Sequence, residues 1–190
     1  MKLLGINGSP RTGGNTEILL DRALFGAKNK GAKTEHLVLN NLKFSPCQEC
    51  AQIDKNKGCK VIDDMQDVYK KINRSDAIIL ASPIFFGSLS AQTKMMIDRF
   101  QCFWMAKYVF KKDLFSKRKI GAFISVEASN RKDFFTNAKS IVKNLFATID
   151  IEYKFELLCS GVDKKAGILR YPALLDKAFN LGQKIVLEKI

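Results

Sequence analysis

Short apolar stretches alternate along this chain with longer segments whose apolar residues recur at helical spacing. Period-two or continuous apolar runs predict strands at residues 3–6, 33–39, 76–81, 120–125 and 151–158. Amphipathic stripes predict helices at residues 17–29, 65–74, 132–148 and from Pro172 onward, and a longer helix, capped by Ser88 or Ser90, that runs to Trp104. Strands that alternate with helices in this way predict a parallel sheet joined by right-handed crossovers.

The character of single strands refines this prediction. Residues 76–81 (DAIILA) are apolar on both faces, as expected of a central strand that helices cover on each side. Residues 151–158 alternate charged with apolar side chains, which predicts an edge strand. The pattern is that of an α/β domain spanning residues 1–190, with a doubly wound five-stranded parallel sheet of the flavodoxin-like kind. Its ligands are expected beyond the carboxyl ends of the strands.

The stretch KLLGINGSPRTGGNT, residues 2–16, reads as a strand, a glycine-rich loop and the start of a helix. A helix N-terminus and backbone amides suit an anion, and Ser9, Arg11, Asn15 and Thr16 add polar donors. The loop lacks the Lys-Ser or Lys-Thr of a nucleoside triphosphate loop and the G-x-G-x-x-G of a dinucleotide fold, so a monophosphate fits better. The alternative interpretation is a strand-to-helix turn that binds no ligand and needs its glycines only for its backbone conformation.

Two further loops, residues 82–87 and 126–130, follow predicted strands and are expected to meet the first loop. The second one carries Pro83, Phe85 and Phe86, which suit a planar ring held by stacking. A phosphate and an aromatic ring together describe flavin mononucleotide, FMN. The alternative for Phe85 and Phe86 is ordinary core packing.

Three motifs, GSPRTGGNT, SPIFFGSLSAQTKMMIDRF and the spaced CQEC…GCKVIDDMQ, resemble the flavodoxin-like NAD(P)H-dependent FMN reductases and the related iron-sulfur flavoproteins over nearly the whole chain. The resemblance implies a site in which the first loop holds the FMN phosphate, the second lies along the isoalloxazine and the third borders the ring. The implied residues are Ser9, Pro10, Arg11, Asn15 and Thr16 in the first loop, Pro83, Ile84, Phe85, Phe86 and Gly87 in the second, and Ser125 in the third. It also implies a homodimer or homotetramer in which a neighbouring subunit helps to close the site.

The sequence departs from the family pattern at two places in these loops. Phe85 stands where relatives often carry tyrosine, so any contact of that hydroxyl is absent. The third loop, SVEASN, lacks the glycines often found there.

The cysteines allow two interpretations. Iron-sulfur flavoproteins carry a compact run of four cysteines, but this chain has Cys47, Cys50 and Cys59, and Ile53 stands where the third cysteine of a C-x2-C-x2-C pattern would fall. Because a four-iron cluster usually needs four thiolates, the favoured interpretation is a loop of reduced thiols, and the cluster would require Cys102 or Cys159 as a further ligand. Zinc also lacks a fourth ligand, since the only histidine, His36, falls in a predicted strand.

The composition of the chain does not help to locate a binding site, but it indicates which classes of partner are expected. The formal net charge is +13, and the scattered lysines favour a solvated surface over a nucleic-acid groove. Residues 107–119 interleave basic and aromatic side chains, which can stack bases but more often bury the aromatics against the protein. No apolar run is long enough for a signal peptide or a membrane span, so a cytoplasmic protein without a membrane partner is expected.

These observations predict an FMN-dependent oxidoreductase that takes electrons from NADH or NADPH and passes them to a small acceptor such as a quinone, nitro compound, flavin or iron chelate. The alternative is an electron-transfer flavoprotein that exchanges electrons with a protein partner, for which an acidic redox protein would suit the positive charge. No catalytic side chain is predicted, because the cofactor carries the hydride chemistry. The sequence does not choose between NADH and NADPH.

Overall fold

The computed structural model describes residues 1–49, 58–115, 117–131 and 133–188. The strands are β1 (Lys2–Asn7), β2 (Lys33–Val38), β3 (Ala77–Phe85), β4 (Ser88–Leu89), β5 (Lys119–Val126) and β6 (Ile151–Cys159). The α-helices are α1 (Asn15–Asn29), α2 (Met65–Arg74), α3 (Ala91–Asp98), α4 (Gln101–Trp104), α5 (Phe134–Thr148) and α6 (Pro172–Leu187). A π-helical turn follows α4 at Met105–Val109, and 3₁₀ turns lie at Leu39–Asn41 and Gly167–Arg170.

The main sheet has the strand order β2-β1-β3-β5-β6, and every neighbouring pair in it is parallel. The five predicted strands are therefore confirmed, with the charged strand β6 at an edge as predicted. The short strand β4 adds an antiparallel pair at the end of β3. This order places the reversal of winding between β1 and β3, where doubly wound sheets bind their ligands.

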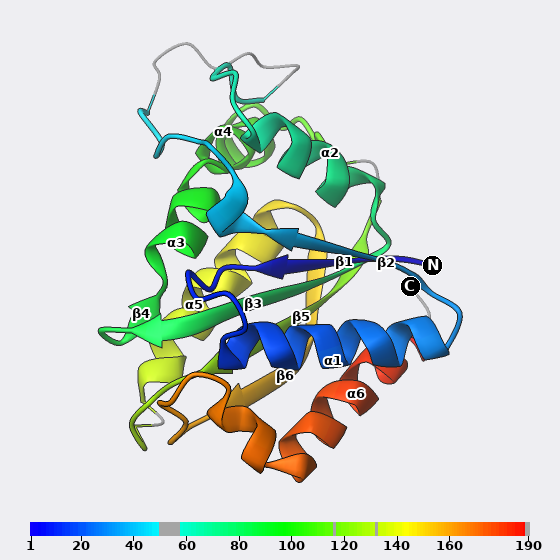
Figure 1. The fold of residues 1–190 in the computed structure, drawn as a ribbon. Coiled ribbons are helices and arrows are strands. Elements are labelled where there is room, and N and C mark those ends of the chain that lie inside the picture. Colours follow the sequence, from blue (N-terminus) through cyan, green and yellow to red (C-terminus); the bar gives the residue numbers. More distant parts are fainter. Residues whose placement is uncertain (50–57, 116, 132, 189–190) are drawn as a thin grey trace.

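Helices cover both faces of the sheet (Figure 1), and each face has its own hydrophobic core. Successive residues of β3 alternate between the two cores: Ile78 and Leu80 belong to the core under α2 and α5, and Ile79 and Ala81 to the core under α1 and α6. Side chains of a strand point to opposite faces in turn, so a central strand must be apolar throughout.

Helix α6 packs closely against α1, the helix that follows the first loop, and so holds α1 in position on the sheet. A Cβ atom at Gly182 of α6 would lie 1.8 Å from the carbonyl oxygen of Ala23 in α1. Any larger residue at this position would push the helices apart. The close approach therefore depends on glycine.

The helix predicted to end at Trp104 is wrong in one respect, because it is broken after Asp98 and resumes as α4. Arg99, at the break, is buried and turns its guanidinium onto the loop before α2, where its Nη1 atom lies 2.5 Å from Asp63 Oδ2. The Arg99 carbonyl accepts a hydrogen bond of 2.9 Å from the Tyr69 hydroxyl. Despite the opposing effect of desolvation, the hydrogen bond from Arg99 helps to lower the pKa of the Asp63 carboxyl. At the break between α3 and α4, the Arg99 carbonyl thus accepts a hydrogen bond from a side chain of α2.

The loop predicted at residues 82–87 is also partly a strand, since β3 continues through Phe85 and turns back into β4. None of the described helices combines the length and apolar character needed to cross a membrane.

Candidate functional site

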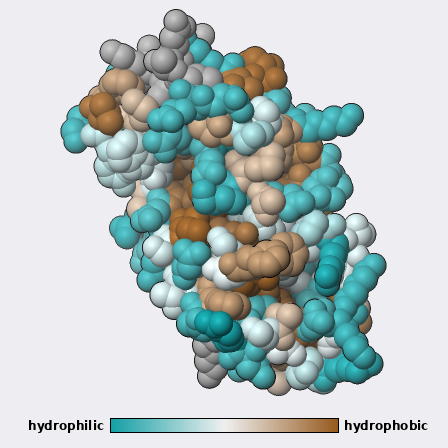
Figure 2. All heavy atoms as spheres, turned by 90° about the vertical axis from the view of Figure 1, so that its left-hand side faces the viewer, coloured by the Kyte–Doolittle hydropathy of each residue, from teal (hydrophilic) through white to brown (hydrophobic). Residues whose placement is uncertain are grey.

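Loops from four parts of the chain meet at the carboxyl edge of the sheet. The Gly8 amide donates to the Ala81 carbonyl over 2.8 Å, which joins the loop after β1 to β3. The Gly161 amide donates to the Ser129 carbonyl over 2.9 Å, and the Val162 amide donates to the Glu127 carbonyl over 3.1 Å. These two bonds join the loops after β5 and β6. Figure 2 faces this edge and shows hydrophobic surface exposed near its middle, with hydrophilic surface around it.

The first loop, residues 8–14, holds its shape through its own polar groups. Asn7 Oδ1 accepts the Ser9 amide over 2.9 Å, and Ser9 Oγ accepts the Arg11 amide over 3.2 Å. Gly13 has φ 66°, a conformation that favours glycine. The Gly13 amide donates to Glu17 Oε2 over 2.5 Å, so a carboxylate already lies against this loop.

The N-terminus of α1 has the character of an anion site. Its N-cap residue, Gly14, provides no side-chain cap, which leaves first-turn amides without the usual acceptor. Ser9 and Thr16 are buried beside it, and Arg11 is exposed. The Lys165 side chain also reaches this loop, because its Cε atom would lie 3.6 Å from a Cβ atom built on Gly13. Lys165 lies 152 positions after Gly13, and no local sequence signal could have placed it here.

The Asn15 side chain, which the family resemblance places at the FMN phosphate, has hydrogen-bond partners within the protein. Its Nδ2 atom donates to the carbonyls of Val162 and Lys164 over 3.2 and 3.0 Å, and its Oδ1 atom accepts the Ile168 amide over 3.1 Å. The side chain amide thus binds the segment after β6 with both of its ends. We infer that Asn15 positions Lys165 next to the first loop.

The second loop is a two-residue hairpin between β3 and β4. Phe86 and Gly87 have φ values of 51° and 72°, so both central residues are left-handed, as in a type I′ turn. Phenylalanine is a poor choice for this conformation, which asparagine or glycine normally occupies. The Phe86 side chain is nevertheless fully exposed, at 108% of its reference area, and Phe85 is exposed at 38%. A strained, exposed aromatic residue at a ligand-binding edge indicates a contact that the isolated chain does not satisfy.

The rest of the second loop is tied to the body of the protein. Ile84 is buried and pairs with Leu89, whereas Pro83 is half-buried. The Gly87 carbonyl accepts the Asn137 side-chain amide over 3.0 Å. Core packing, the alternative interpretation of the two phenylalanines, therefore applies to Ile84 and not to them.

A buried group of hydroxyls joins the first two loops. Ser90 Oγ donates to the Gly8 carbonyl over 2.6 Å and accepts the Thr93 amide over 3.3 Å, which makes Ser90 the N-cap of α3. The Ser90 amide in turn donates to Ser82 Oγ over 3.1 Å. Of the two serines predicted to cap this helix, the structure selects Ser90.

The third loop differs most from the expected site. Ser125 is fully buried, and its hydroxyl donates to the Ser82 carbonyl over 2.7 Å, so the side chain joins β5 to β3. Glu127 is a residue that the sequence reasoning missed. It is only 3% exposed, its Oε2 atom accepts the Ser129 hydroxyl over 2.6 Å, and its buried Oε1 atom has no partner among the described residues. A buried carboxylate oxygen without a partner is rare in folded proteins, which makes Glu127 a further candidate residue at this edge.

The cysteines of the described chain do not assemble a cluster site. Cys59 Sγ lies 3.3 Å from Arg99 Nη2, and Cys102 lies close enough to interact with that thiol, while burial is the main cause that raises the pKa of Cys102 to about 12. Cys159 belongs to the core on the other face of the sheet. Cys50 and Ile53 lie outside the described residues. Among the described residues, no three cysteines come within ligand distance of one another.

Asn15 provides a test of the positioning role in flavin-free protein. Asn15→Ala removes three hydrogen bonds and leaves buried backbone groups unpaired, so we expect the free energy of unfolding to fall by about 2–3 kcal/mol. Urea denaturation would measure the change, with Thr12→Ala in the exposed turn as a control that changes stability by less than about 0.5 kcal/mol. Unchanged stability with lost flavin binding would instead make Asn15 a direct ligand.

Comparison with known proteins shows the family to which the chain belongs. The family model for NADPH-dependent FMN reductase matches residues 1–142. An iron-sulfur flavoprotein of Methanocaldococcus jannaschii is 31% identical over 191 residues, which cover 97% of this chain and 95% of that one.

Solved structures share the fold at lower identity. A flavone reductase superposes with a TM-score of 0.73 at 22% identity, covering 98% of this chain and 62% of that one. An NAD(P)H:quinone oxidoreductase from Methanothermobacter marburgensis superposes with a TM-score of 0.70 at 16% identity, covering 99% of both chains. The predicted flavodoxin-like fold, the enzyme class and the cofactor FMN are confirmed, whereas the individual FMN contacts stay predictions. The chain belongs to the family of NADPH-dependent FMN reductases.

Proposed function

We propose that this protein transfers electrons from NADH or NADPH to a small acceptor, such as a quinone, a nitro compound, free flavin or an iron chelate. The observation that carries the proposal is the uncapped N-terminus of α1, which lies beside basic side chains at the same sheet edge as an exposed aromatic hairpin. Bound FMN supplies the chemistry, because its isoalloxazine accepts a hydride and releases electrons one or two at a time.

The first loop would hold the FMN phosphate. First-turn amides of α1, the hydroxyls of Ser9 and Thr16, and the guanidinium of Arg11 would donate to its oxygens. Pro10 lies half-buried between Ser9 and Arg11 and contributes through the backbone of the loop. Lys165 would add a second positive charge from the segment that Asn15 anchors.

The hairpin would hold the ring. Residues 83–87 present an edge of backbone and the side chains of Phe85 and Phe86, which offer an apolar surface for stacking. The unpaired oxygen of Glu127, at the end of β5, would accept an N–H of the ring. Ser125 would act indirectly, because its hydroxyl fixes the Ser82 carbonyl next to Pro83.

The second candidate is an electron-transfer flavoprotein with a protein partner. The net charge of +13 supports it, since an acidic redox protein would dock on a basic surface. The exposed Phe86 supports either a flavin contact or one made by a neighbouring subunit of a homodimer or homotetramer. Reaction with nicotinamide distinguishes the two candidate functions.

The first test is the visible absorption spectrum of the anaerobically purified protein, followed by addition of NADH and then NADPH. We expect a flavin spectrum that at least one nucleotide bleaches rapidly, since the proposed reaction begins with hydride transfer. A flavin spectrum that neither nucleotide changes would support the carrier. A broad iron-sulfur absorption would show that the cysteine loop binds a cluster.

The phosphate contacts can be tested by comparing FMN with riboflavin, which lacks the phosphate. Lys165→Ala and the double variant Arg11→Ala with Thr16→Val should each weaken FMN binding about tenfold or more and leave riboflavin binding unchanged. Lys28→Ala, at the other end of α1, serves as a control of equal charge. Equal losses for both flavins would contradict a phosphate contact.

Replacing Phe86 in the hairpin is expected to change the stability of the protein and its affinity for FMN in opposite directions. Phe86→Asn should stabilise the flavin-free protein by about 1 kcal/mol, because asparagine tolerates the left-handed conformation, and weaken FMN binding about tenfold by removing the stacking surface. Thermal unfolding and fluorescence titration would measure the two effects. Lys111→Asn, at another left-handed position with φ 54°, should gain stability without affecting FMN. If Phe86→Asn binds FMN normally, Phe86 makes no flavin contact.

A further inference from the structure

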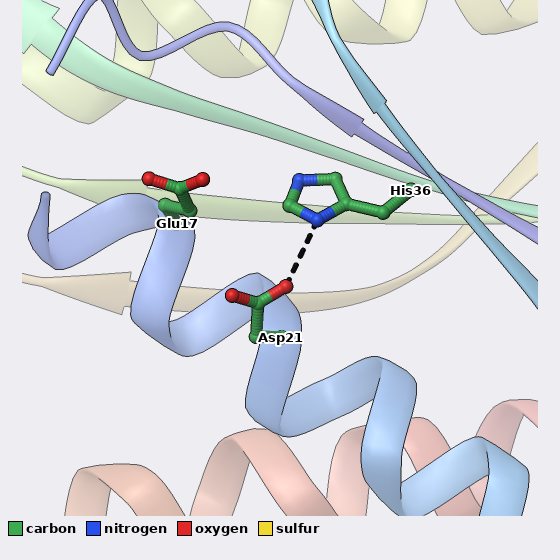
Figure 3. Close-up of side chains that lie close together, drawn as sticks. All are labelled: Glu17, Asp21 and His36. Carbon is green, nitrogen blue, oxygen red and sulfur yellow. Dashed lines mark ion pairs between the residues drawn. The ribbon is translucent and has the colours of Figure 1, made fainter. Parts of the chain in front are cut away.

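Two carboxylates and one imidazole converge beside the first loop. Glu17 and Asp21 lie one turn apart on α1, and His36 lies on the adjacent edge strand β2. One ligand atom from each lies within 4.8 Å of the others, and His36 Nδ1 is 3.0 Å from Asp21 Oδ1. Figure 3 shows the two carboxylates on the side of α1 that faces the imidazole.

The positions of these residues follow from the fold. Residues four apart on a helix lie on the same face, so α1 presents both carboxylates together. Packing of α1 against the sheet brings this face to β2, where His36 is paired with Gly5 of β1. All three residues are partly accessible to solvent, so an ion can reach them.

We propose that Glu17, Asp21 and His36 bind a divalent transition-metal ion of the zinc and cobalt class. One imidazole nitrogen and carboxylate oxygens are ligands that these ions accept, whereas Mg²⁺ and Ca²⁺ prefer oxygen alone. Water completes the coordination. His36 and Asp21 form an ion pair when the imidazole is protonated, so the metal ion would displace that proton. The deprotonated imidazole and the two carboxylates then carry two negative charges, which match the charge of the ion in a chain that is otherwise strongly positive.

The ion would also act on the phosphate loop, and this consequence rests on the proposed function. Glu17 Oε2 accepts the Gly13 amide, so the negative charge of Glu17 lies where it opposes a bound phosphate. The other oxygen of the same carboxylate is available to a metal ion. A dication at this position would neutralise Glu17 and raise the affinity for FMN.

The test uses flavin-free, metal-free full-length protein titrated with CoCl₂ under anaerobic conditions. We expect one Co²⁺ ion per chain by calorimetry, without the near-ultraviolet charge-transfer band of cobalt–thiolate bonds. His36→Gln and Asp21→Asn should each weaken binding at least tenfold. Glu35→Gln, which removes a carboxylate from the residue next to His36 on β2, is the matched control and should bind normally.

Circular dichroism of each variant checks that it folds. Absence of stoichiometric binding to the wild-type protein would overturn the proposal, as would binding that persists in His36→Gln with a thiolate band, because the cysteines would then be the ligands. The FMN titration is separate: metal binding without any FMN binding would overturn the proposed function and leave the metal site standing. If FMN binds equally well with and without Co²⁺, the link through Glu17 is wrong.

Discussion

The parallel pairing of β1 with β3 is the interaction on which the site depends. The chain leaves β1 through α1 toward β2 on one side, and leaves β3 through α3 and α4 toward β5 on the other. Because the two crossovers diverge, their loops leave space for a ligand between them. The Gly8 amide continues the pairing past the end of β1, and the Ser90 hydroxyl binds the Gly8 carbonyl from the other loop. The two halves of the site are thus held at a fixed separation by buried hydrogen bonds.

Electrostatics at the start of α1 sets a balance between attraction and repulsion of an anion. The helix N-terminus, Arg11 and Lys165 favour a phosphate, whereas Glu17 occupies the amide of Gly13 with its own carboxylate. The carboxylate gives that partly buried amide a hydrogen-bond partner within the protein. In the proposed phosphate site, a bound phosphate would compete with this carboxylate for the Gly13 amide.

The basic and aromatic segment at residues 107–119 is largely accounted for by the fold. Phe115 is buried against Phe103, with ring centroids 5.1 Å apart. Lys107 Nζ lies 2.5 Å from Asp150 and 2.8 Å from the Ala147 carbonyl. These contacts agree with aromatics buried against the protein and lysines on its surface. Tyr108 stays partly exposed beside Trp104.

The sequence by itself determined that the sheet is parallel and doubly wound, that β6 lies at an edge, and that a glycine-rich loop joins β1 to α1, because these features follow from local periodicity and from glycine and polar residues close together in the chain. It also carried enough family motifs to identify the cofactor. The predictions that were wrong concern single segments. The helix predicted to end at Trp104 breaks at Arg99, which is buried and forms an ion pair with Asp63. Strand β3 extends into the predicted loop and ends in a hairpin in which Phe86 has a left-handed backbone conformation.

Only the tertiary structure decided which side chains lie together at the carboxyl edge of the sheet. The internal partners of two predicted site residues come from the fold: the Asn15 amide bonds to the backbone of Val162, Lys164 and Ile168, and the Ser125 hydroxyl bonds to the Ser82 carbonyl. Lys165, Glu127 and the group of Glu17, Asp21 and His36 carry no signal in the sequence. Their partners are set by crossovers that join distant residues, and a hydrogen bond or ion pair depends on the final positions of both groups.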